Sequence, residues 1–144
     1  MRLLPLYTVT LLILFSNCVG PPEYTDGLLE NIPAITNESD YFSLSILGYD
    51  YTDNNEWDLL FAGAIEDEIL TTLVIKDLNI SQSDSTYLYL VNNEGDTLIN
   101  GGVFNDVIYT SQDSLKHIGF PTKVILNANN FTGRLDFQII KYQQ

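Results

Sequence analysis

The chain has very few of the side chains that carry metal and nucleophilic chemistry: one cysteine, one histidine and one tryptophan in 144 residues. Zinc sites are built mainly from Cys and His, so a catalytic zinc centre is not expected. A Ser–His–Asp triad would have to use His117, and the sequence has no Gly-x-Ser-x-Gly turn to present the serine. We therefore expect a protein that is not an enzyme, with His117 on the solvent side of a strand.

Basic residues are also scarce, with 6 Lys and Arg against 19 Asp and Glu and a formal net charge of −13. A chain with this balance cannot neutralise phosphates, which argues against nucleic acid as a partner. Residues 19–75 hold twelve of the acidic residues and no basic one, whereas the remainder is nearly balanced. Such a one-sided charge serves solubility, or it attracts a basic partner surface or divalent cations.

The N-terminus has the layout of an export signal. Arg2 precedes an apolar stretch over residues 3–15, which is too short for a membrane-spanning helix of about 20 residues. Ser16 and Asn17 follow, and then Cys18, the only cysteine. This arrangement resembles the relaxed lipobox of small Bacteroidetes-type lipoproteins, although a strict lipobox has Gly or Ala at the position of Asn17.

The resemblance implies that residues 1–17 are a signal peptide and that Cys18 receives the lipid. Two or more acyl chains at one site give a stable membrane anchor. The protein would then be held on a bacterial cell envelope, at the outer membrane, with the membrane as its first partner. A signal peptide with a chance cysteine near its end is the alternative.

Composition divides the remaining chain into two parts. Residues 18–40 are acidic, have Gly20, Pro21 and Pro22 near their start, and are expected to be a flexible tether, with some apolar residues that could form a helical turn or pack on the domain. Residues 41–144 are expected to form one domain. They contain short runs rich in β-forming residues, bounded by Gly, Asn and Asp. The runs are 41–49, 57–65, 69–76, 86–92, 96–99, 103–109, 115–118, 123–128 and 134–142.

Several of these runs alternate cleanly, so that Leu88 and Leu90 lie on one side of a strand and Tyr87, Tyr89 and Val91 on the other. Strands at this spacing predict an all-β fold, an antiparallel β-sandwich of immunoglobulin-like or jelly-roll-like type. A small closed β-barrel is the alternative.

The segment 49–58 combines acidic and aromatic residues. Asp50, Asp53 and Asp58 offer oxygen ligands at close spacing, which suits Ca²⁺ as the one cofactor to consider, although the spacing is not that of an EF-hand. A solvated hairpin turn is the alternative interpretation. Tyr49, Tyr51 and Trp57 of the same segment could form an aromatic platform for a sugar, unless the lone Trp lies in the core.

Three tripeptides resemble the Asp-Ser/Thr-apolar O-glycosylation site of Bacteroidetes-type exported proteins, with Ser85, Thr97 and Ser114 as acceptors. Together these features predict a lipid-anchored envelope protein that acts as a non-enzymatic binding or accessory module. Its partner would be an envelope protein. A carbohydrate-binding surface lipoprotein, with a glycan as ligand, is the alternative.

Overall fold

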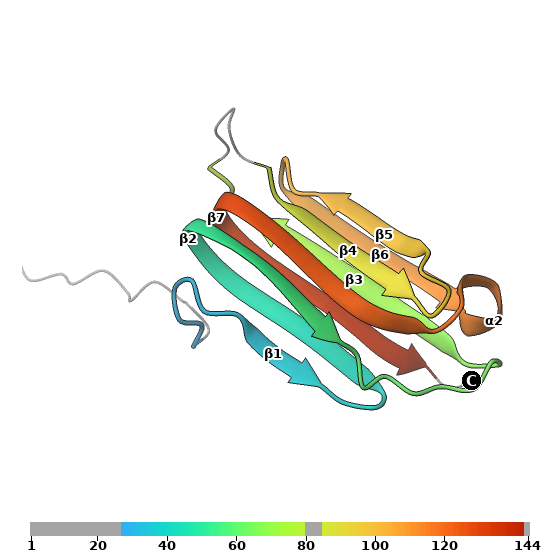
Figure 1. Ribbon diagram of the computed structural model, residues 1–144. Coiled ribbons are helices and arrows are strands. Elements are labelled where there is room, and N and C mark those ends of the chain that lie inside the picture. The colour runs from blue at the N-terminus through green and yellow to red at the C-terminus, as the bar shows by residue number, and fades with distance from the viewer. Residues whose placement is uncertain (1–26, 80–84, 143–144) are drawn as a thin grey trace, which may run out of the picture.

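The computed structural model describes residues 27–79 and 85–142. Within these ranges the chain forms seven strands and one four-residue helix (Figure 1). The elements are β1 (Ala34–Asn37), β2 (Tyr41–Asp58), β3 (Glu68–Lys76), β4 (Tyr87–Asn92), β5 (Thr97–Gly102), β6 (Val107–Ser114), α2 (Leu115–Ile118) and β7 (Pro121–Tyr142).

All strand pairings are antiparallel, and two long strands, β2 and β7, run through the whole sheet. Residues 41–48 of β2 pair with residues 133–140 of β7. In this part of the sheet β2 also pairs with β1, and β7 also pairs with β3, which gives a first half-sheet in the order β1-β2-β7-β3-β6. The other portions, residues 53–58 of β2 and 121–127 of β7, continue into β4 and β5 and form a second half-sheet. The two half-sheets make an all-β sandwich, as predicted, and the sheet is open, not closed into a barrel.

The long strands fold back on themselves. A straight strand of the length of β2 would span about 60 Å at about 3.3 Å per residue. Yet Asn37, which pairs with Phe42 near the start of β2, donates from its Nδ2 to the carbonyl of Asp58 at the end of β2, at 2.8 Å. Figure 1 shows β2 and β7 turning together at one end of the molecule.

The bend is made by residues that tolerate unusual backbone angles. Asp50 and Asn130 have φ values of 50° and 56°, and Gly133 has a φ of 148°. Asp and Asn are the residue types other than glycine that most readily adopt left-handed angles. The register of β2 against β7 also shifts between Gly48 and Asp53, and such bulges increase the local twist of a strand pair.

The core lies between the half-sheets and is made of alternate residues of the strands. In β2, Phe42, Leu44 and Ile46 are fully buried, and the buried residues of β7 face them at matching positions. Burying side chains of this size contributes about 1.5–3 kcal/mol each. The rest of the core is Tyr51, Ile69, Leu73, Ile75, Leu88, Leu90, Val103, Leu115, Val124, Leu126, Ala128, Phe131, Leu135, Phe137 and Ile139.

Several predicted turns and strands are wrong in detail. Residues 53–55 are expected to be a turn but lie inside β2 in regular register with β7, and residues 129–130 lie inside β7, where Asn130 bends the strand instead of ending it. The predicted strand 57–65 ends at Asp58. The predicted strand 115–118 is instead the single helical turn α2, which ends where the N–H of Gly119 donates to the carbonyl of Leu115.

The last part of the expected tether is attached to the domain. β1 pairs with the start of β2, and Glu30 forms a parallel bridge with Leu47. The side chain of Asn31 exchanges two hydrogen bonds, of 2.8 and 2.9 Å, with the backbone of Tyr49. Residues 30–37 therefore follow β2 as an edge of the first half-sheet, so a tether would have to lie before them.

Candidate binding surface

The outer face of the second half-sheet carries a compact group of aromatic and amide side chains. Because Leu88 and Leu90 point into the core, Tyr87 and Tyr89 of β4 point outward. Cross-strand partners share a face of the sheet. One row across this face is Asn54, Asn127, Tyr87 and Gly102, and the next is Glu56, Ile125, Tyr89 and Asn100.

The aromatic rings contact one another. The rings of Tyr87 and Tyr89 are nearly parallel, with centroids 6.1 Å apart. Phe104, just after β5, meets Tyr87 edge to face at 5.7 Å. Its ring lies over Gly102, where a Cβ atom would come within 2.2 Å of it. Phe104 remains 52% exposed, so the rings present an apolar surface to solvent. We call these side chains, with the amides described next, the aromatic face.

Three amides border the rings. Asn54 and Asn100 are exposed and Asn127 is half-buried, and none of their side chains hydrogen-bonds to another described residue. Each amide offers two donor hydrogens and one acceptor oxygen. The aromatic face therefore combines apolar rings with uncommitted, uncharged hydrogen-bonding groups.

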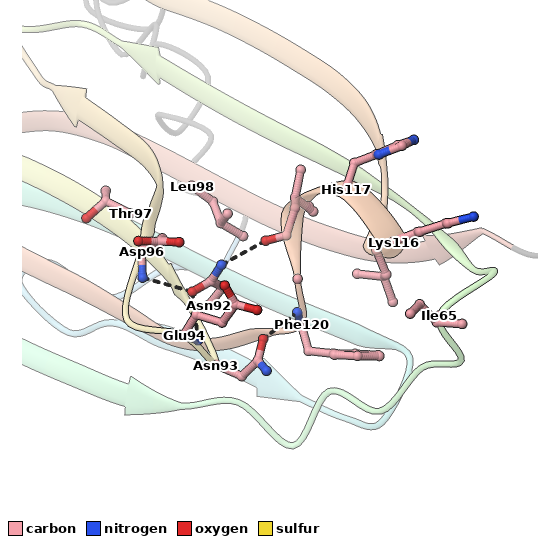
Figure 2. A pocket seen from close by; sticks show the side chains of 13 residues that line it. Ile65, Asn92, Asn93, Glu94, Asp96, Thr97, Leu98, Lys116, His117 and Phe120 are labelled. Atoms are coloured by element: carbon pink, nitrogen blue, oxygen red, sulfur yellow. Dashed lines mark hydrogen bonds between the residues drawn. The ribbon is translucent and has the colours of Figure 1, made fainter.

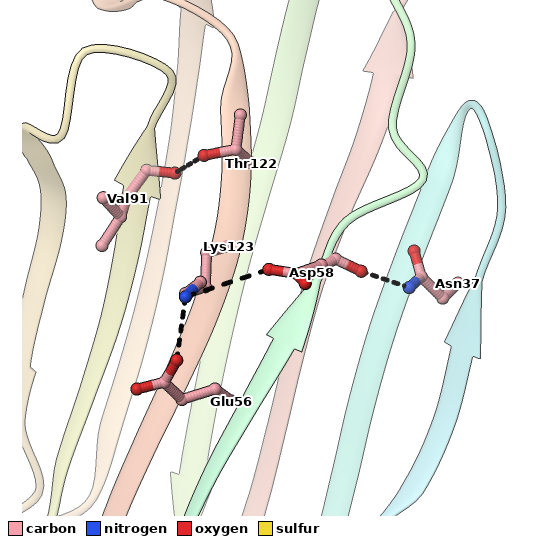
Figure 3. Close-up of polar contacts among 6 residues, drawn as sticks. All are labelled: Asn37, Glu56, Asp58, Val91, Thr122 and Lys123. Carbon is pink, nitrogen blue, oxygen red and sulfur yellow. Dashed lines mark hydrogen bonds and ion pairs between the residues drawn. The ribbon is translucent and has the colours of Figure 1, made fainter.

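An ion pair closes one side of the aromatic face (Figure 3). The Nζ of Lys123 lies 2.8 Å from Glu56 Oε2 and 3.9 Å from Asp58 Oδ1. The hydrogen bond to Glu56, followed by the charge of that carboxylate, raises the pKa of Lys123. These charges neutralise one another in part, so they define a polar border without giving the aromatic face a strong charge.

The outer face of the first half-sheet differs in composition. Its central positions are taken by small or aliphatic side chains and one long amide, and no aromatic ring lies among them in the described strands. They are Ser43, Ser45, Thr72, Val74, Thr110, Gln138 and the ion pair of Asp136 with Arg134. Tyr41, Tyr49 and Tyr142 stand toward the ends of this face, so what distinguishes the second half-sheet is that its outward rings contact one another.

A second candidate is a hollow of about 430 Å³ at the end of the sandwich, between the β4–β5 turn and α2 (Figure 2). The side chain of Asn92, which is 5% exposed, links the β4–β5 turn to α2. Its Oδ1 accepts from the N–H groups of Glu94 and Asp96, and its Nδ2 donates to the carbonyl of Ile118. Asn93 Oδ1 likewise accepts from the N–H of Phe120. These amides are committed to holding the turn.

His117 lies at this end of the molecule. It is exposed, as expected, although it stands on α2 and not on a strand. Figure 2 shows Lys116 and His117 directed away from the Asn92 amide. Among the described residues that line the hollow, neither Lys116 nor His117 contacts a carboxylate or a hydroxyl group, and we interpret the hollow as a structural cap.

The aromatic platform predicted from Tyr49, Tyr51 and Trp57 is not assembled. Tyr51 is 6% exposed and belongs to the core, and Trp57 packs against the same core from its partly buried position. Only Tyr49, at 63% exposure, presents its ring to solvent. Burial, and then the nearby carboxylate of Asp53, raise the pKa of Tyr51.

The three aspartates considered for Ca²⁺ each have a different neighbour. Asp50 contacts the hydroxyl of Thr132 across the bend, Asp53 accepts from the N–H of Asn54, and Asp58 lies beside Lys123. Within residues 27–79 and 85–142, no group of three or more Asp, Glu, His or Cys side chains is placed to hold a metal. The strand that carries these residues spreads them apart.

The positions suggested for modification are distributed as follows. Cys18 and the expected signal peptide, residues 1–17, lie outside the described residues. Of the O-glycosylation acceptors, Ser85 and Thr97 are exposed, and Ser114 is half-buried at the start of α2. Among the described residues, no helix has the length and apolar character needed to cross a membrane.

The chain matches no protein-family model and no curated protein. Solved structures similar to it include the following two. One is accessory secretory protein 1, 2 and 3 of Streptococcus pneumoniae, at 15% identity and a TM-score of 0.33 over 87% of this chain and 91% of that one. The other is infectious bursal disease virus, Gx strain, at 12% identity and a TM-score of 0.35 over 78% of this chain and 31% of that one. At these values neither structure assigns a function to the chain.

Proposed function

We propose that the protein is a non-enzymatic binding module, held on a bacterial envelope by lipid at Cys18, and that it binds a glycan on the aromatic face. The observation that carries this proposal is the pair of cross-strand rows in which Tyr87 and Tyr89 are flanked by amides. Sugars present apolar C–H surfaces beside hydroxyl groups. Aromatic rings contact the former, and amides donate to and accept from the latter.

The dimensions of the aromatic face suit a short saccharide. Neighbouring strands lie about 4.8 Å apart, and residues two apart on a strand are separated by about 6.6 Å. The four strands and two rows therefore cover roughly 14 Å by 7 Å, which extends further where Phe104 and the Lys123–Glu56 pair border it. A ligand on so open a surface would lie along it instead of entering a cleft.

Binding without hydrolysis also fits the carboxylates of this face. A glycosidase needs one carboxyl group that stays protonated and a second one opposite it. Glu56 and Asp58 share a single strand and both approach Lys123, so they lie side by side and do not stand on opposite sides of a ligand. This pair is therefore suited to positioning a ligand and not to proton transfer.

The test is binding of the full chain, purified in mild detergent, to a panel of envelope and host polysaccharides by affinity electrophoresis. Tyr87→Ala and Tyr89→Ala should weaken binding roughly five- to tenfold, since an aromatic contact is worth about 1 kcal/mol. Tyr49→Ala, which removes an exposed ring outside the aromatic face, is the matched control. Equal losses in all three variants, or no retarded polysaccharide, would refute the proposal.

A further inference from the structure

The free edge of β6 borders an apolar groove on the open side of the sandwich. β6 pairs only with β3, and β5 only with β4, so both strands are edges of the described sheet. Between them lies a groove of about 280 Å³ lined by Leu73, Ile75, Leu98, Ile99, Val107 and Tyr109. We call it the edge groove. Two of these residues, Leu73 and Ile75, belong to the core, so the groove reaches into the interior.

The inward residues of β6 line this groove. Val107 and Tyr109 stand opposite Ile75 and Leu73 on β3, so they share the core-facing side of the sheet. They are nevertheless not fully covered, and Tyr109 is 41% exposed. On the outward side, Ile108 is 77% exposed. An added strand would cover apolar surface on both sides of β6.

On the β5 side, the groove is lined by Gly101, a residue without a side chain. Gly101 stands opposite Leu88, so a side chain at this position would point inward. A Cβ atom there would lie 3.4 Å from Leu73 Cδ2. The absence of a side chain at residue 101 therefore leaves space in the edge groove that a larger residue would fill.

β6 has little of the usual protection of an edge strand along most of its length. Exposed edges are commonly blocked by Lys, Pro, a bulge or an inward-pointing charge. β6 contains neither Lys nor Pro, and its register against β3 is uninterrupted from Val107 to Ser114. Its single charged residue, Asp113, stands opposite Ile69 on the core-facing side and is an inward charge at one end of the strand. Its outer row of backbone N–H and C=O groups is available to another strand.

Charge indicates the kind of strand that would fit. At one end of β6, Asp113 stands near Glu68. At the other end, two carboxylates, Asp77 and Asp106, and one cation, Lys76, surround Ile108. Both ends are thus net acidic and the middle is uncharged. A second copy would bring its own acidic ends to these positions in an antiparallel pairing, and each copy carries a net charge of −13. A cationic guest is favoured over self-association.

We propose that the β6 edge binds an extended segment of a basic partner protein, which adds as a further strand, places apolar side chains in the edge groove and sets Lys or Arg against the acidic ends. In this mode backbone hydrogen bonds supply affinity and alternate side chains supply specificity. The edge groove meets the aromatic face at Asn100 and Gly102 of β5, but the proposal does not depend on glycan binding.

The test uses a labelled synthetic peptide of sequence Lys-Lys-Val-Thr-Val-Thr-Val-Lys-Lys, with fluorescence anisotropy against the full chain in mild detergent. A peptide with Glu in place of every Lys should bind at least tenfold more weakly. Two further peptides are N-methylated at alternate residues, one set each. Since a guest uses only one of its own edges, one methylated peptide should bind and the other should not. Hydrogen exchange should show protection over residues 107–114.

Gly101→Val should weaken peptide binding at least tenfold, because the valine side chain fills the edge groove. Tyr109→Ser is a second variant, which removes an aromatic ring from the lining of the groove. Ser45→Val, which adds the same side chain on the solvent side of β2, is the matched control and should bind normally. Equal binding of the Lys and Glu peptides, or protection outside β6, would overturn the proposal. So would a concentration-dependent dimer that excludes the peptide, because it would assign the edge to a second copy.

Discussion

Gly48 is the position at which the folded-back ribbon of β2 and β7 should be most sensitive to substitution. A Cβ atom built on Gly48 would lie 2.5 Å from Cδ1 and 2.8 Å from the backbone oxygen of Phe131, which is itself 3% exposed. The ring could rotate away, but the backbone oxygen cannot move without displacing β7. Gly48→Ala therefore forces a shift at the bend.

The size of the effect follows from two opposing terms. Overpacking a well-filled site costs typically 1–3 kcal/mol, and the contact with a backbone atom places this site near the upper end. Replacing glycine reduces the entropy of the unfolded chain and returns about 0.7 kcal/mol. We expect Gly48→Ala to lower the free energy of unfolding by about 2 kcal/mol. For a domain of roughly 115 residues this corresponds to a decrease of about 8 °C in Tm.

Urea denaturation followed by intrinsic fluorescence measures this change. Gly101→Ala is the control, because its Cβ would meet only the end of Leu73, at 3.4 Å, and it should stay within about 0.5 kcal/mol of the parent. Adding Phe131→Leu to Gly48→Ala should cost less than the sum of the two changes, since the ring contact is relieved. A Gly48→Ala variant as stable as the parent would refute this account of the bend.

Four further predictions concern other parts of the chain. Asn92→Ala should lower the free energy of unfolding by about 2–3 kcal/mol, measured in urea, because two N–H groups and one carbonyl lose their partner; a loss below 0.5 kcal/mol would contradict the structural role given to this amide. Because the pKa of Tyr51 is raised in the folded protein, its contribution to stability is complete below the unfolded pKa of about 10 and is lost as the pH rises through the folded pKa. In melting curves taken above pH 10, Tyr51→Phe should therefore lose less stability than the parent. Millimolar CaCl₂ should change Tm no more than MgCl₂ of the same concentration, whereas a shift specific to Ca²⁺ that Asp53→Asn abolishes would restore a calcium site. Cys18→Ala should abolish palmitate labelling and release the protein from the membrane fraction, and labelling that persists would exclude lipid at this residue.

The class of the fold could be predicted because alternation directly reports one buried and one exposed side of each strand. Leu88 and Leu90 against Tyr87 and Tyr89 is one such pattern, and the structure places them on the two sides as expected. The lengths of the strands could not be predicted. An Asp or Asn residue such as Asp50 or Asn130 can either end a strand or bend it, and the sequence around it looks the same in both cases. Only pairing with the neighbouring strand decides between these outcomes.

The candidate site was predicted less well than the fold. Sequence proximity grouped Tyr49, Tyr51 and Trp57, but the bulge at the bend and the alternation of β2 bury Tyr51 and turn Trp57 toward the core. The aromatic face instead combines residues of the β4–β5 hairpin with residues of β2 and β7, which are far from it in the sequence. The alternation around Tyr87 and Tyr89 was a visible signal for part of it, whereas the positions of Phe104 and Asn127 depend on strand order, which the sequence does not reveal.

The order in which the strands occur along the chain has a consequence for when the protein can fold. β7 is the last strand in the sequence, yet it pairs with β2, β3 and β4 and joins the two half-sheets. In a chain that emerges N-terminus first, from a ribosome or through a membrane pore, β2, β3 and β4 cannot pair with β7 until β7 has emerged as well. Pairings of this sequence separation also form slowly. The topology therefore lets the pairs β1–β2, β3–β6 and β4–β5 form early but delays the joining of the two half-sheets until β7 is available.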